Sequence, residues 1–172
     1  MEKNLLSIRN LTVEYHTDDD IVYAVNGISL ELGRGESLGL VGETGAGKTT
    51  IAKSILGILP KAQSKIVSGE IVFEDEELLS LNEKKMQKIR GNKIAMIFQD
   101  PMTALNPIET VGFQIAEAIL QHNKISKKES RERACAMLEM VGIPMERYNE
   151  YPHQFSGGMK QRVVIAMALA CN

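Results

Sequence analysis

The chain has 172 residues, a length that suits one ordinary domain. Hydrophobic residues make up 44% of it and charged residues 24%, values typical of soluble globular proteins. The formal net charge of -2 argues against nucleic acid as the main partner, because a phosphate backbone attracts clustered Lys and Arg.

Cysteine and histidine usage favours neither disulfides nor a zinc site. The two cysteines, Cys135 and Cys171, lie far apart without a C-x-x-C pair, so we expect two reduced thiols. Metal-ligand spacing is also missing from the histidines His16, His122 and His153. No secretory signal opens the chain, and its longest apolar run, residues 163–171, is far shorter than the ~20 residues that span a bilayer. We therefore expect any work at a membrane to depend on docking to another subunit.

The front of the chain alternates apolar and polar residues, which predicts antiparallel strands. The alternation covers residues 11–15 and returns at 21–25. Three aspartates at 18–20 predict an exposed turn, and Asn26-Gly27 predicts a tight turn before residues 28–32. Together these signals indicate an antiparallel meander.

Two short apolar runs, residues 37–41 and 93–98, predict buried strands of an α/β core. Helical spacing predicts a helix over 49–56, which Gly57 ends. A further strand is predicted at 71–73, and a charged, exposed helix at 81–90.

The rest of the chain predicts helices. Apolar residues recur at four-residue spacing over 111–119. Ser126-Lys127-Lys128-Glu129 is a capping box that opens a second helix, which Gly142 ends. A third helix is predicted over 157–170, and because it is apolar on every side from Val163 we expect it to be buried.

A phosphate-binding loop follows the first predicted buried strand. Gly42-Glu43-Thr44-Gly45-Ala46-Gly47-Lys48-Thr49 matches G-x-x-x-x-G-K-[ST], with a strand before it and a helix after it. The glycines let backbone N–H groups ring the phosphates, and the helix start adds partial positive charge. We expect Lys48 to reach the β- and γ-phosphates, Thr49 to bind Mg²⁺, and Thr50 to donate on the α-phosphate side. The alternative is a glycine-rich turn with an unpaired surface lysine.

A second motif resembles a known family. Residues 155–162, FSGGMKQR, are similar to the L-S-G-G-Q signature of ABC transporters, and Gln99 within 96–101 resembles the Q-loop. The longer run 96–107, MIFQDPMTALNP, resembles the ATPase subunits of bacterial peptide and nickel importers. Phe155 and Met159 depart from the consensus, and Met159 lacks the hydrogen-bonding amide of Gln. The resemblance extends from about Leu5 to the last residue.

This resemblance implies an α/β fold: a P-loop NTPase core with an antiparallel β subdomain and a helical subdomain. Residues 1–100 would form the β subdomain and core, 101–155 the helical subdomain, and 156–172 the signature helix. The whole would be a partial ABC nucleotide-binding domain.

The resemblance also implies roles for particular residues, with ATP and Mg²⁺ as cofactors. Ser156, Gly157 and Gly158 would meet the γ-phosphate of ATP on the facing subunit. Tyr15 would stack on adenine, although a core-facing strand tyrosine is the alternative. Gln99 would sense the γ-phosphate and Mg²⁺, although a polar residue at the end of a strand that binds nothing is the alternative.

The expected function is an ATP-hydrolysing subunit of a bacterial or archaeal importer. Peptide is the first expected cargo and nickel the second. The expected partners are a second ABC ATPase subunit, identical or a paralogue, and transmembrane permease subunits that hold the chain peripherally at the cytoplasmic face of the membrane.

The sequence contains no apolar strand that ends in Asp and Glu after the signature, and no D-loop or switch His. We therefore expect very slow hydrolysis by this chain alone, and poor cover for residues 38–41 and 94–98. A non-catalytic nucleotide-binding module is the main alternative. An ABC ATPase that acts in DNA repair or on the ribosome usually has coiled-coil insertions or basic arms, which this sequence lacks. A P-loop kinase would not explain Ser156-Gly157-Gly158.

Overall fold

The structure is a computed structural model, which describes residues 4–17, 20–100 and 103–171. The chain divides into two compact units, Met1–Met86 and Gln87–Asn172. Asp18 and Asp19 of the predicted turn, and Pro101 and Met102 of the run 96–107, lie outside the described residues.

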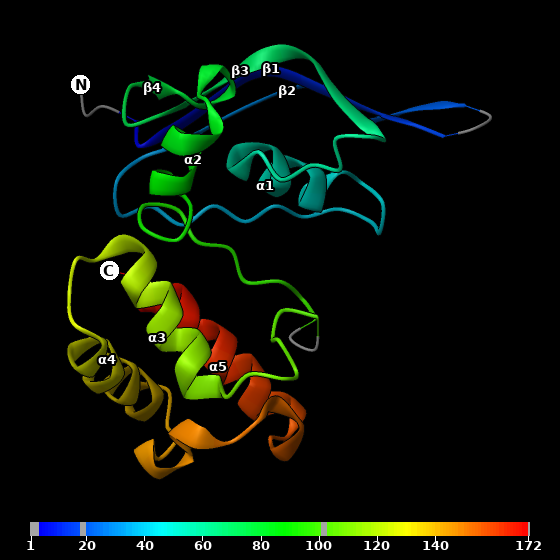
Figure 1. The fold of residues 1–172 in the computed structure, drawn as a ribbon. Coiled ribbons are helices and arrows are strands. Elements are labelled where there is room, and N and C mark those ends of the chain that lie inside the picture. The colour runs from blue at the N-terminus through cyan, green and yellow to red at the C-terminus, as the bar shows by residue number, and fades with distance from the viewer. Residues whose placement is uncertain (1–3, 18–19, 101–102, 172) are drawn as a thin grey trace. The chain divides into compact units, whose positions relative to one another are not determined.

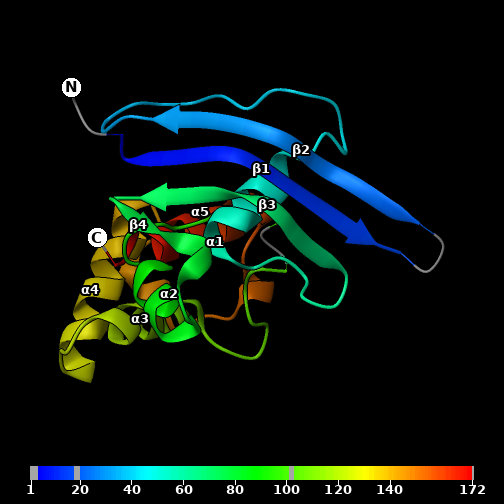
Figure 2. The same cartoon turned by 90° about the horizontal axis from the view of Figure 1, so that it is seen from above.

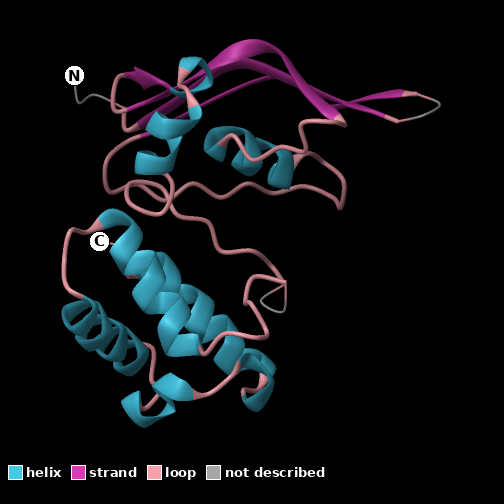
Figure 3. Ribbon diagram, viewed as in Figure 1, coloured by secondary structure: helices cyan, strands magenta, loops and turns pink. Residues whose placement is uncertain are grey.

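A four-stranded antiparallel sheet forms most of the first unit (Figures 1 and 3). Its strands, in the order β2-β1-β3-β4, are β2 (Ile21–Leu32), β1 (Leu6–His16), β3 (Ser64–Phe73) and β4 (Glu76–Glu77). A short 3-10 turn, η1 (Leu78–Ser80), follows β4. The predicted antiparallel pairing of the first two strands and the strand at 71–73 are confirmed.

The tight turn predicted at Asn26-Gly27 is wrong, because β2 runs straight through it. Leu11 of β1 pairs with Ile28, whereas Val13 pairs with Val25, so β2 holds an extra residue there. Gly27 has a φ of 63° and donates its N–H to the Thr12 hydroxyl at 3.0 Å. A left-handed glycine in this setting makes a β-bulge inside a long strand instead of a hairpin turn.

Helix α1 (Lys48–Leu56) lies against one face of this sheet (Figures 1 and 2). It buries Ile51 and Leu56, and Gly57 ends it in the left-handed conformation at φ 60°. The predicted helix over 49–56 is confirmed. Helix α2 (Glu83–Ile89) confirms the helix predicted over 81–90, and the division between the two units falls within it. Its Met86 and Ile89 are buried, so the helix is exposed on one side only.

The buried strands predicted at 37–41 and 93–98 are wrong. Residues 37–41 are irregular, with Val41 98% exposed. In 93–98 only an isolated bridge between Arg90 and Ile94 forms. An apolar run becomes a strand only where a neighbouring strand accepts its hydrogen bonds, and among the described residues neither run joins a sheet. The poor cover expected for residues 38–41 and 94–98 agrees with the exposure of Leu38, Leu40, Val41, Ile97 and Phe98.

The second unit is helical (Figure 3). Its elements are α3 (Val111–His122), α4 (Lys127–Met140), η2 (Met145–Asn149), η3 (Pro152–Gln154) and α5 (Gly157–Leu169). The Ser126 hydroxyl accepts the N–H of Glu129 at 3.1 Å, which confirms the predicted start of α4. The carbonyls of Val141 and Gly142, just past its end, accept from Arg162 Nη1 at 3.1 and 3.0 Å.

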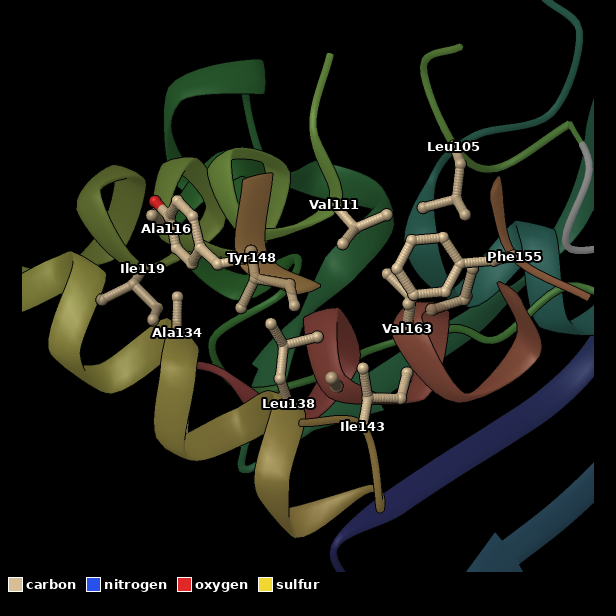
Figure 4. Packing of buried hydrophobic residues seen from close by; sticks show 13 residues of the cluster. Leu105, Val111, Ala116, Ile119, Ala134, Leu138, Ile143, Tyr148, Phe155 and Val163 are labelled. Carbon is tan, nitrogen blue, oxygen red and sulfur yellow. The ribbon is translucent and has the colours of Figure 1, made fainter. Parts of the chain in front are cut away.

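One hydrophobic cluster joins these helices (Figure 4). Its fully buried members include Val111, Ile115 and Ile119 of α3, which confirms the predicted apolar face. Helix α5 contributes Val163, Val164 and Ala166, but Leu169 is 42% exposed. The complete burial predicted for this helix is therefore wrong, because α3 and α4 cover only part of its circumference.

Candidate phosphate-binding site

The loop of residues 42–47 runs between β2 and α1 and is held close to β2. Gly47, the residue before α1, has a φ of 81°. A Cβ at this position would collide with the main-chain carbonyl of Ala24 on β2. Gly45 is left-handed as well, at φ 87°. Only glycine fits the backbone at Gly47, for reasons of both conformation and space.

Lys48 folds back over this loop. Its Nζ donates to the carbonyls of Gly42 at 2.6 Å and Glu43 at 2.7 Å. The first turn of α1 contains no acidic side chain, so nothing there neutralises the partial positive charge of the helix start. An ammonium group and a free helix start at one loop fit a phosphate chain.

The two threonines that follow differ in exposure. Thr49 is exposed, whereas Thr50 is buried. The Thr50 carbonyl accepts from the Ser54 hydroxyl at 2.7 Å. Mg²⁺ usually keeps few protein ligands beside phosphate oxygens and water, and the exposed Thr49 hydroxyl fits that need. The predicted contact of Thr50 with the α-phosphate stays a prediction.

Tyr15 on β1 lies next to the start of α1. Its hydroxyl is 3.5 Å from the Thr50 hydroxyl, and its side chain is half-buried. Tyr23 of β2 is the other aromatic residue of the first two strands, and it is 61% exposed. Of these two tyrosines, Tyr15 is the one placed beside the phosphate loop.

Gln99 is exposed and lies in an irregular segment of the second unit. Its predicted place at the end of a buried strand is therefore wrong, for the reason given for residues 93–98. Its predicted contact with the γ-phosphate and Mg²⁺ stays a prediction.

The start of α5 presents a second free set of backbone N–H groups. The Ser156 hydroxyl accepts the N–H of Met159 at 3.4 Å, as expected of a residue that caps a helix. Gly157 and Gly158 are exposed, and a Cβ on either would meet nothing within 4 Å. The first turn holds no acidic residue. The helix start is therefore open to close approach by an anion.

Arg147 was not predicted from the sequence, yet it contacts the residues on either side of this turn. Its guanidinium carbon lies 4.2 Å from the ring centroid of Phe155, and its Nη1 lies 3.3 Å from Met159 Sδ. No motif marks this arginine, and only the fold brings it to the signature.

Comparison with known proteins decides the family. The profile described as "ABC transporter" matches residues 25–172. The chain belongs to the ABC transporter family. Among curated ABC relatives, the dipeptide transport ATP-binding protein DppD of Bacillus subtilis is 53% identical over 173 residues, covering 99% of this chain and 51% of the relative. A probable peptide ABC transporter ATP-binding protein of Sinorhizobium fredii is 49% identical, covering 98% and 51%.

Solved ABC cassettes share the fold. The ATP-binding cassette MJ0796, in a dimeric post-hydrolysis state bound to ADP and Pi, has a TM-score of 0.85 at 30% identity, and the match covers 97% of this chain and 70% of that one. The expected α/β class of the ABC nucleotide-binding domain is confirmed. The chain spans about half the length of the curated relatives that it matches.

Proposed function

We propose that this chain is the ATP-binding portion of an ATPase subunit that energises peptide import. The observation that carries the proposal is the loop 42–47, in which Lys48 folds over a glycine-rich turn at a helix start. The names of the peptide-transport relatives support the cargo class. ABC ATPase domains bind ATP, and the cassette MJ0796 binds ADP and Pi.

The residues at and near the loop have different tasks in this proposal. The backbone N–H groups of Gly45, Ala46 and Gly47 surround the phosphates, while Lys48 exchanges its two carbonyl partners for the β- and γ-phosphates. Thr49 offers its hydroxyl to Mg²⁺, which supplies charge neutralisation when bound. Gln99 senses the γ-phosphate, and Tyr15 stacks on the base.

The start of α5 serves a second nucleotide. Ser156, Gly157 and Gly158 meet the γ-phosphate of ATP held by a facing ABC subunit, identical or a paralogue. The dimeric form of MJ0796 supports such pairing. Two ATP molecules then close the pair, and hydrolysis reopens it.

The remaining partners are permease subunits in the membrane. No helix among the described residues is long and apolar enough to cross a bilayer. We place the subunit peripherally at the cytoplasmic face, with about residues 101–151 as the part that docks on the permease.

A pair of lysine variants in the full-length subunit tests the proposal. Lys48→Ala should abolish ATP-dependent peptide uptake, because the phosphates lose their cation. Lys53→Ala, in the last turn of the same helix, should leave uptake unchanged. Normal uptake by the Lys48 variant would sink the assignment. Nucleotide affinity and phosphate release, measured on the full-length subunit, separate an ATPase from a module that binds ATP without turnover.

A further inference from the structure

Arg147, in η2, joins three residues around the start of α5. Its guanidinium carbon lies 4.2 Å from the centroid of the Phe155 ring. Its Nη1 donates to Met159 Sδ at 3.3 Å, and its Nη2 donates to the carbonyl of Gln154 at 3.1 Å. A single planar cation therefore contacts the chain on both sides of the Ser156–Gly158 turn.

Glu150 fixes the direction of this guanidinium. Its Oε2 accepts from Arg147 Nε at 2.8 Å and lies 2.6 Å from Nη2. The ion pair raises the pKa of Arg147 above its ordinary value, so the group stays charged. The carbonyl of Glu150 in turn accepts the N–H of Val111 at 2.9 Å. Since Val111 is fully buried, the ion pair is attached to the helical core through α3.

Phe155 and Met159 are the two positions where this chain departs from the L-S-G-G-Q consensus, and both contact Arg147. A cation stacks on an aromatic face, which leucine lacks. A thioether sulfur is a soft, weak acceptor that suits a large delocalised cation. Figure 4 shows the Phe155 ring directed into the buried cluster, on the side where Leu105 and Val163 lie. The two departures thus form one cluster with Arg147.

The glycines between them lie in the first turn of α5 and have no side chains that could pack against the rest of the helical unit. A Cβ at Gly157 or Gly158 would meet nothing within 4 Å, and glycine loses more conformational freedom on folding than any other residue. Their N–H groups are therefore ordered by the helix with its Ser156 cap and by the flanking residues, two of which, Phe155 and Met159, Arg147 contacts.

We propose that Arg147 is a positioning residue: it fixes the Ser156–Gly158 turn, and Phe155 and Met159 are its partners in doing so. The inference rests on the proposed role of that turn in meeting ATP on a facing subunit. Arg147 itself contacts no nucleotide. Its loss changes how well the turn closes on a phosphate and leaves the affinity of the loop at 42–47 for ATP unchanged.

Two measurements on the full-length subunit separate these effects: binding of a fluorescent ATP analogue to the monomer, and ATP-driven association followed by sedimentation. Arg147→Ala should weaken association by about tenfold or more and change analogue affinity by less than about twofold. In a Phe155→Leu/Met159→Leu background the same substitution should weaken association less, because both side-chain partners at the signature are gone and neither leucine replaces them with a new acceptor. If Arg147→Ala weakened association equally in both backgrounds, Phe155 and Met159 would not be its partners.

Arg131→Ala is the matched control. The Arg131 guanidinium lies 4.7 Å from the Tyr148 ring centroid, so this variant loses a comparable stacking contact in the same unit. If both variants weakened association equally, the effect would come from general destabilisation of the helical unit, and the inference would be overturned. If Arg147→Ala fails to fold, Arg147→Lys replaces it, since lysine keeps the charge but not the planar fork. Association of the Arg147→Lys variant at the parent's strength would count against the proposal.

Gly158→Asp separates the inference from the proposed function. If this variant abolishes association while Arg147→Ala leaves it intact, Arg147 is no positioning residue and the role of the turn stands. If neither variant affects association, the role of the turn fails, and the inference fails with it.

Discussion

The hydroxyl of Tyr15 lies 3.5 Å from that of Thr50, although the two residues are 35 positions apart in the chain. Tyr15 belongs to β1 and Thr50 to the first turn of α1. The contact ties the aromatic ring to the helix that begins at the phosphate loop. The position proposed for the base is therefore set by the packing of the first unit.

Substitution of Tyr15 should separate stacking from this contact. Tyr15→Ala should weaken ATP binding by about 5- to 150-fold, since base–aromatic stacking contributes roughly 1–3 kcal/mol. Tyr15→Phe keeps the ring and should bind ATP nearly as well as the parent. Titration with a fluorescent ATP analogue measures both. Tyr23→Ala, which removes an exposed ring on the neighbouring strand, is the control. If it lowered ATP affinity as much as Tyr15→Ala does, the assignment of Tyr15 would be contradicted.

Gly47→Ala should both destabilise the first unit and disable the phosphate loop. The left-handed φ of 81° costs an alanine about 1–2 kcal/mol, and its Cβ would collide with the Ala24 carbonyl. Thermal melting and ATP titration measure the two effects. Gly27→Ala shares the left-handed backbone at φ 63° but has open space around it, so it should lower stability while ATP binding persists. Wild-type ATP affinity in Gly47→Ala would exclude this loop as the site.

Gly157→Ala should improve folding and impair function. Because its Cβ meets nothing within 4 Å, alanine in the first turn of α5 should stabilise the helix by roughly 0.5–1 kcal/mol. The added methyl group should nevertheless hinder a phosphate that approaches the backbone, so ATP-driven association should weaken. Urea unfolding measures the gain in stability, and sedimentation measures the loss of association. Unimpaired association would mean that no ligand comes close to this residue.

Gly112→Ala tests the core of the helical unit. A Cβ at this position of α3 would collide with the ring of Tyr148, so we expect a loss of about 1–3 kcal/mol in the free energy of unfolding. The midpoint of urea unfolding measures it. In a Tyr148→Ala background the same substitution should cost far less, and an unchanged cost there would rule out the ring as its cause.

Helix starts and ends were predictable because their signals are local. Ser126 and Ser156 cap α4 and α5 with their own hydroxyls, and Gly57 ends α1 through its own backbone. The strands at 37–41 and 93–98 were mispredicted because pairing is not local. An apolar run shows that a segment suits a strand and does not show that a neighbour is present.

The candidate site shows the same contrast between local signals, which the sequence reveals, and non-local contacts, which it does not. The loop 42–49 is contiguous, so its glycines, Lys48 and Thr49 were visible in the sequence. The bulge at Gly27 was not, because Asn26-Gly27 reads equally well as a hairpin turn. Arg147 was not either, because its contacts depend on how η2 folds back onto the start of α5.

The empty space around Gly157 and Gly158 has a consequence for anyone who redesigns this protein. A procedure that scores only the melting temperature of the isolated chain would replace both glycines early, since alanine there adds helical preference at no steric cost. If the start of α5 meets a facing subunit as proposed, such a library would select against association while the melting temperature of the monomer rose. The two positions should therefore be held constant in any stabilisation campaign.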